Sequence, residues 1–201
     1  MSRILCLILL TLLAALTILA ALAIGSASFS LSETWAGLNG SGDPLVRELI
    51  YELRLPRALT AFGTGAALAI AGVMLQVLLR NPLADPYILG VSGGAALGAL
   101  GALLLGAGLA AMNVAALVGA LGAIAIVFAL SFRAGDWNLH RLLLTGVVLS
   151  AGFSALISLI LVLAPQAQVK GMLFWLMGDL SNAAASGPAW LLLVALLLGF
   201  V

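Results

Sequence analysis

Few side chains in this 201-residue sequence could do chemistry, and the first group is a pair of arginines. Arg54 and Arg57 lie in the tetrapeptide Arg54-Leu55-Pro56-Arg57. A guanidinium group can bind a carboxylate through two parallel hydrogen bonds, so the pair predicts contact with an acidic partner. An alternative is that both arginines sit at the end of a spanning helix and extend their charged heads to the membrane surface.

The second group lies in the segment Arg80-Asn81-Pro82-Leu83-Ala84-Asp85-Pro86. Pro82 and Pro86 end one helix and prevent its simple continuation into the next. Asp85 is expected to cap the following helix, and Asn81 can bond backbone groups that the break leaves free. Two interpretations remain open. The segment is either a well-capped tight turn or a broken element facing a transport pathway, because irregular backbone near the membrane is buried in protein or lines water.

The third group is a stripe of small residues on one helix. Its members are four residues apart and therefore share a face: Gly146, Ser150, Ser154 and Ser158. Their hydroxyls either bond neighbouring helices, at about 0.6 kcal/mol per contact, or line a pathway that passes a bulky solute without trapping it.

Several other kinds of chemistry find no support in the sequence. With one cysteine and one histidine, no His/Cys metal cluster is expected, and no cofactor is expected either. No phosphate-binding G-x-x-x-x-G-K-[ST] motif occurs, and a net charge of +1 does not favour nucleic acid. Ser92, in Gly90-Val91-Ser92-Gly93, fits the pattern of an intramembrane serine protease, but the candidate base His140 lies in a charged turn.

These groups must be positioned by membrane-spanning helices, because 64% of the residues are hydrophobic and only 7% are charged. Soluble domains carry about 25% charged residues. Five uncharged stretches are long enough to cross a bilayer, namely residues 4–24, 58–79, 88–109, 112–130 and 142–164. We therefore predict an all-α, polytopic membrane helix bundle with five complete transmembrane helices. A sixth stretch, 189–201, has the composition of a helix cut short, so we expect a fragment.

The charges suggest how the bundle is arranged. Arg3 precedes the first stretch, which places the N-terminus in the cytoplasm. In the next loop, Asp43-Pro44 predicts the start of an interfacial helix that presents Arg47, Glu48 and Glu52 to water and ends at residues 54–57. An ion-gradient-driven transporter is a rival interpretation, but such proteins usually keep an ionisable residue inside the membrane, and these stretches contain none.

Several motifs together resemble one family, the FecCD-type permeases. These are membrane subunits of binding-protein-dependent ABC importers for iron–siderophores, haem and cobalamin. The motifs that carry the resemblance stand in the family's order over nearly the whole chain: residues 54–57, 65–72, Gln76, 80–86, 89–95, 145–150 and 174–178.

The resemblance implies a fold and partners that composition alone does not. Residues 1–201 would be the N-terminal part of a single ten-helix permease domain in the bacterial inner membrane. It would pair with a second copy or a related permease, with cytoplasmic ATPase subunits and with a periplasmic or lipid-anchored binding protein, surrounded by membrane lipid.

The resemblance also implies roles for particular residues. Arg54 and Arg57 would dock the binding protein, and the stripe would line the translocation pathway for an iron–siderophore or related chelate. ATP-driven alternating access would move that cargo, and the permease itself would not be an enzyme. The identity of the cargo, and whether the partner permease is identical, stay open. The ATPase-contacting residues are expected beyond this sequence.

Overall fold

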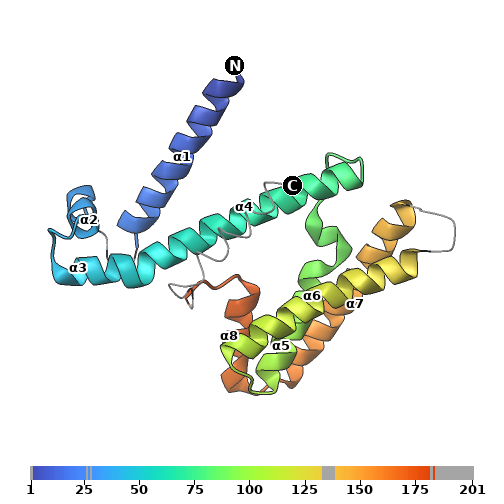
Figure 1. Cartoon of the computed structure of the whole chain (residues 1–201). Coiled ribbons are helices and arrows are strands. Elements are labelled where there is room, and N and C mark those ends of the chain that lie inside the picture. Colours follow the sequence, from blue (N-terminus) through green and yellow to red (C-terminus); the bar gives the residue numbers. More distant parts are fainter. Residues whose placement is uncertain (1, 26, 28, 133–138, 182, 184–201) are drawn as a thin grey trace. The chain divides into compact units, whose positions relative to one another are not determined.

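A computed structural model describes residues 2–25, 27, 29–132, 139–181 and 183. Its described residues form helices and connecting turns, with no strand among them (Figure 1). In chain order the elements are α1 Arg3–Ala23, α2 Leu31–Leu38, α3 Pro44–Glu48, the π-helix η1 Leu49–Arg54, α4 Leu55–Leu78, the 3-10 helix η2 Pro86–Leu89, α5 Val91–Leu104, α6 Leu109–Ser131, α7 Leu139–Leu163 and α8 Gln166–Leu176. The predicted truncated helix 189–201 lies outside the described residues.

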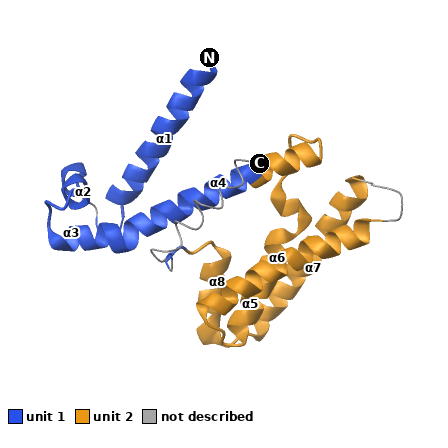
Figure 2. Cartoon of the chain, viewed as in Figure 1, with its two compact units in different colours: residues 1–70, 180–201 blue, residues 71–179 orange. Residues whose placement is uncertain are grey.

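The chain divides into two compact units, each with its own packed core (Figure 2). Unit 1 comprises residues 1–70 and 180–201, and unit 2 comprises residues 71–179. In unit 1, Leu22 of α1 packs with Ile50 and Ala58, which come from the helix that follows the loop. In unit 2, one cluster joins the end of α4 to the α6 and α7 helices, and a second joins α5, α6 and α8.

Four of the five predicted spans correspond to long apolar helices. Among the described residues, α1, Pro44–Leu78, α6 and α7 are long and apolar enough to cross a membrane. Each contains nearly the whole of the stretch predicted from the distribution of charge. The all-α membrane fold is therefore confirmed.

The fifth predicted span, residues 88–109, is wrong as a single crossing helix. Its helical part is α5, with 14 residues and a length of about 21 Å at 1.5 Å per residue. A hydrocarbon core is about 30 Å thick. The backbone of Gly90 has φ 73° and that of Gly106 has φ 71°, so the chain leaves the helical conformation at both ends of α5. The apolar composition continues through these glycines, and it therefore gave no sign of the breaks.

The predicted end of the interfacial helix at residues 54–57 is also wrong, because the helix continues from Pro44 to Leu78. Pro56 has no N–H, and its ring would clash with a carbonyl of the preceding turn in a regular α-helix. Here the turn before it is the wider π-helix η1, in which Leu55 N–H bonds to Ile50 O, five residues back. The wider turn accommodates the proline, and the helix is not interrupted.

The pair α5 and α6 is packed through two glycines of α5 that are four residues apart, Gly94 and Gly98. A Cβ at Gly94 would overlap Gly119 O, and a Cβ at Gly98 would overlap Ala115 O. These pairings run in opposite directions along the two helices, so α5 and α6 are antiparallel neighbours. Close backbone approach of this kind holds helices together where lipid removes the hydrophobic drive.

Candidate functional site

Arg54, predicted to meet an acidic partner, points its guanidinium at the end of α1. Its Nη1 donates to Leu22 O at 2.6 Å and to Ala23 O at 3.0 Å, and its Nη2 donates to Ala27 O. The guanidinium carbon lies 4.2 Å from the centre of the Phe29 ring. The last carbonyls of a helix lack intrahelical partners and attract cations. Arg54 therefore caps α1 and fixes the chain that leaves it.

Arg57, the other predicted docking residue, is exposed. Its described hydrogen bond runs from Nη2 to Ser181 O at 3.4 Å, which is long for a charged donor. The structure thus gives the two arginines different surroundings. Most of the Arg54 fork is used within the chain, whereas Arg57 remains available at the surface of unit 1.

A second exposed cation, Arg47, was not singled out as a site residue by the sequence. Arg47 and Arg54 are seven residues apart and would share a face of a regular α-helix. The π-helix η1 between them adds one residue to the turn, which rotates the following residues by roughly 100°. Arg54 consequently faces α1, and Arg47 faces a cavity on the other side.

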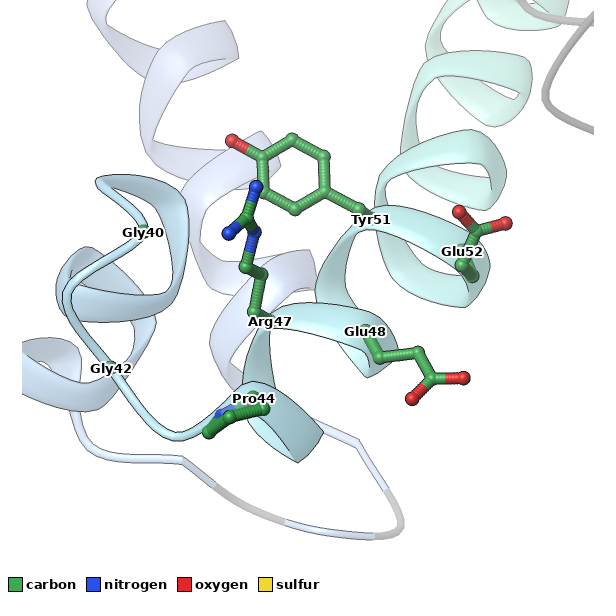
Figure 3. A pocket seen from close by; sticks show the side chains of 7 residues that line it. All are labelled: Gly40, Gly42, Pro44, Arg47, Glu48, Tyr51 and Glu52. Carbon is green, nitrogen blue, oxygen red and sulfur yellow. The ribbon is translucent and has the colours of Figure 1, made fainter.

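This cavity has a volume of about 460 Å³ and lies between the turn after α2 and the α3–η1 helix (Figure 3). Its lining residues come from both walls: Gly40, Gly42, Pro44, Arg47, Glu48, Tyr51 and Glu52. The Tyr51 hydroxyl donates to Leu38 O at 2.8 Å and ties the two walls together. The sequence offered one sign of this cavity. Tyr51 lies four residues after Arg47, and the turn that precedes them contains Gly40 and Gly42.

The two helices next to this cavity, α2 and α3, each begin with a side-chain cap. Ser30 and Glu33 form a capping box at the start of α2, with Ser30 N–H donating to the Glu33 carboxylate at 2.8 Å. This backbone N–H, and then the Ser30 hydroxyl, lower the pKa of Glu33. The Asp43 carboxylate accepts from Leu45 N–H at 2.9 Å, and this confirms the cap expected before Pro44.

The segment 80–86 is capped by its own Asn81 and Asp85 side chains, and its Ala84 is buried in unit 2, whereas Leu83 is exposed. Asn81 Oδ1 accepts from Leu83 N–H at 2.9 Å, and Asp85 Oδ1 accepts from Tyr87 N–H at 2.8 Å. Pro86 is the first residue of η2, so Asp85 caps a short 3-10 helix and not α5 directly. Leu79 and Ala84 on either side of Pro82 are buried in the core.

The structure brings η2 and Gly90, which directly follow this segment, together with the start of the stripe on α7. A Cβ at Gly146 would overlap Ile88 O and would stand 3.1 Å from Leu89 Cα. A Cβ at Gly90 would stand 3.3 Å from Ser150 Oγ. The stripe therefore begins against the residues that follow the segment 80–86, and Gly90 and Gly146 permit the close approach.

Farther along α7 the stripe is open. Ser154 and Ser158 are exposed within the described part of the chain, and Ser150 is half-buried. Each hydroxyl donates to the carbonyl four residues earlier, at 2.8 Å from Ser150 to Gly146 and at 2.9 Å for the two later serines. These bonds lie within the helix, and within the described residues no hydrogen bond of these hydroxyls joins α7 to a neighbouring helix.

The protease interpretation gains nothing from the geometry. Within the described ranges, no hydrogen bond joins Ser92 to His140, and each side chain is exposed on a different helix. Those ranges also contain no group of three or more His, Cys, Asp or Glu side chains that could hold a metal ion.

Comparison with known proteins gives a consistent result. The family model described as the FecCD transport family matches residues 11–201. The molybdate import system permease protein MolB of Haemophilus influenzae is 37% identical over 180 residues, which cover 87% of this chain and 53% of MolB. The vitamin B12 import system permease protein BtuC of Shigella boydii is 35% identical over 193 residues, covering 94% of this chain and 55% of BtuC.

A solved structure is similar as well. It is described as an inward-facing conformation of a metal-chelate type ABC transporter, and it matches with a TM-score of 0.80 and 35% identity, over 96% of this chain and 59% of its own. The chain spans about half the length of the curated relatives it matches.

Proposed function

The chain belongs to the FecCD transport family, and on that premise we propose that it is the N-terminal part of the permease subunit of a binding-protein-dependent ABC importer. The similar proteins are import permeases for molybdate and vitamin B12. Four long apolar helices make the chain a multi-pass membrane protein. We place it in the bacterial inner membrane with the N-terminus in the cytoplasm, an orientation supported by Arg3 before α1.

The observation that carries this proposal is the contact of η2, the short helix that follows the segment 80–86, with the uncharged stripe. Ile88 and Leu89 of η2 lie against Gly146, and Ser150, Ser154 and Ser158 continue along α7 from that point. Irregular backbone and small, weakly polar side chains in one place suit a pathway wall. The stripe would let a bulky cargo pass, while ATPase subunits supply the energy by alternating access.

We propose that docking of the binding protein is divided between the two arginines. Arg57, exposed in unit 1, would pair with an acidic residue of the partner. Arg54 would act mainly by holding the end of α1 and the chain after it. The alternative, in which both arginines only reach the membrane surface, fits Arg54 poorly because its guanidinium is bound to three backbone carbonyls.

For the cargo we propose an iron–siderophore or related metal chelate such as haem or cobalamin. The stripe carries no charge, so it would not distinguish one of these chelates from another by charge, and it would not repel an oxyanion. Selection would then belong to the binding protein. A second permease copy or a related permease would complete the pathway.

Reconstituted transport tests the proposal. The intact permease, its ATPase and its binding protein in proteoliposomes should take up one of ferric siderophore, haem, cobalamin or molybdate in an ATP-dependent manner. Charge reversal of Arg57 should weaken the stimulation of ATP hydrolysis by the binding protein and make its salt dependence shallower. Uptake driven by an ion gradient without ATP would support the rival transporter class, and unchanged stimulation would remove the docking role.

A further inference from the structure

Unit 2 contains an apolar groove between α6 and α7, two helices that pack side by side (Figure 1). The groove has a volume of about 550 Å³, and its lining comes from the end of α6 and the first half of α7: Leu130, Leu144, Thr145, Val148, Leu149 and Gly152. Val148 lies about 120° around α7 from Ser154. The groove is therefore on a different face of α7 from the open part of the stripe.

A guanidinium group stands at one end of this groove. Arg141 precedes Thr145, Val148 and Gly152 by four, seven and eleven residues, so the four residues share one face of α7. Arg141 is half-buried and lies in the first turn of α7, where the positive end of the helix dipole also attracts anions. The groove therefore leads from a cationic end into an apolar interior.

The length of the groove matches one leaflet of a bilayer. The uncharged stretch 142–164 begins directly after Arg141, so the hydrocarbon boundary lies close to that residue. Gly152 is about 16 Å farther along the helix axis, and one leaflet is half of a hydrocarbon core about 30 Å thick. The groove thus extends from the membrane surface to near the middle of the membrane.

The leaflet follows from the proposed orientation of the chain. Leu142, next to Arg141, packs in one cluster with Leu79, which directly follows α4. The chain crosses the membrane once through α1 and returns through Pro44–Leu78. With the N-terminus in the cytoplasm, this cluster and the Arg141 end of the groove are on the cytoplasmic side.

The shape of the groove favours a flexible hydrocarbon chain over another helix. Where α5 and α6 approach closely, the backbone of Gly94 meets that of Gly119. The edges of the groove instead carry the bulky, largely exposed side chains of Leu130, Leu144 and Val148. These side chains would keep the backbone of another helix away from the hollow behind them, because close helix packing in membranes needs small residues.

We propose that the groove binds an anionic phospholipid of the cytoplasmic leaflet, with an acyl chain between α6 and α7 and the phosphate on Arg141. A guanidinium can bind two phosphate oxygens through parallel hydrogen bonds, and its five donors allow it to keep a protein partner as well. Basic sites between transmembrane helices on the cytoplasmic side are typical places for anionic headgroups. The choice of leaflet rests on the proposed orientation, whereas the site itself does not depend on transport.

Native mass spectrometry of the intact permease can measure which lipids stay bound after release from nanodiscs with equal amounts of phosphatidylglycerol and phosphatidylcholine. The wild type should retain phosphatidylglycerol preferentially. Arg141→Gln should reduce this preference by about fivefold, the effect of one arginine at an anionic lipid surface, and Arg141→Lys should keep most of it. Arg80→Gln removes an exposed cation at the same end of unit 2 and is the matched control, which should keep the full preference.

Gly152→Leu tests the part of the site that would hold the acyl chain. Among the described residues, nothing lies within 4 Å of a Cβ at Gly152, so the leucine side chain would enter the hollow without a clash. This variant should retain less of both lipids, whereas Gly152→Ala leaves most of the hollow open and is its control. Added phosphatidylglycerol should raise the thermal midpoint of the wild type in detergent but not that of Gly152→Leu.

Three results would overturn the proposal. Unchanged lipid retention in Gly152→Leu with normal assembly would mean that Arg141 binds a free phosphate. Unchanged retention with loss of the partner permease would mean that a helix of the partner covers the groove. Equal losses in Arg141→Gln and Arg80→Gln would show a general effect of surface charge. ATP-dependent uptake is measured in none of these experiments, so the proposed function is tested separately.

Discussion

At the scale of single residues, Arg54 and Arg57 show how two neighbouring arginines take up different tasks. The guanidinium of Arg54 is planar and offers five donors, and it meets three carbonyls and an aromatic ring at once. Arg57 has one hydrogen bond to a carbonyl, and its donor–acceptor distance is long. The chemical identity of the two residues therefore says little about their roles until their surroundings are known.

Replacing Arg54 by lysine should loosen the end of α1. An ammonium group cannot form the same fork, so part of the cap and the stacking on Phe29 would be lost, at a cost of about 1–2 kcal/mol. Hydrogen exchange of amides 22–29 in the intact protein measures this loss.

Arg57→Lys is the matched control and should leave that exchange unchanged. Equal exchange in the wild type and both variants would show that Arg54 does not hold α1.

Some residue-level features could be predicted and others could not. The caps formed by Asp43 and Asp85 depend on the next two residues, so the Asp-Pro dipeptides were sufficient to predict them. The partners of Arg54 lie 27 to 32 residues earlier in the chain. A contact of that range depends on the path of the whole loop, which local pattern does not determine.

At the scale of elements, the spacing of charges located α1, α6 and α7 correctly but did not locate the helix breaks. Placing a charged side chain in the hydrocarbon core costs several kcal/mol, so the positions of the charged residues mark where the spanning helices end. A glycine at φ 73° changes neither charge nor hydropathy, and the split between η2 and α5 therefore escaped prediction. The same applies to η1, since a wider helical turn leaves the apolar pattern almost unchanged.

The contact between η2 and α7 can be tested with a matched pair of glycines on α7. Gly146→Ala would place a methyl group on Ile88 O and should destabilise the protein by about 1–3 kcal/mol. Gly152→Ala has nothing within 4 Å of the new methyl group and should be nearly neutral. Denaturation of the intact protein in mild detergent, followed by its thermal midpoint, compares the two.

A thermal midpoint for Gly146→Ala equal to that of Gly152→Ala would contradict the close packing of α7 on η2. A lowered midpoint together with reduced uptake would connect this contact with transport.

At the scale of the whole molecule, the chain consists of two compact units that share the long helix α4. Unit 1 contains the candidate docking residue Arg57, whereas unit 2 contains the segment 80–86, η2 and the stripe. The proposed recognition of a partner and the proposed passage of cargo are thus assigned to different parts of the fold.

A bulky residue on the stripe tests the pathway assignment in the complete importer. Ser154→Trp should reduce ATP-dependent uptake at least tenfold if α7 lines the route, because the indole would fill space needed by the cargo. Leu156→Trp lies about 200° away around the helix and serves as the control. Uptake measured in proteoliposomes, with normal assembly of both variants, distinguishes them.

If Ser154→Trp and Leu156→Trp transport equally well, the stripe does not face the cargo, and its serines matter only to α7 itself.

The back-bonded serines also determine how a surface of this kind would treat what touches it. Each hydroxyl proton is already committed to a carbonyl of its own helix, so only oxygen lone pairs point outward. Water satisfies such lone pairs as well as most solutes do, and a passing molecule would gain little by replacing it. If the stripe lines a pathway, its serines would offer acceptors but no free donors, and a cargo would gain little by staying on them.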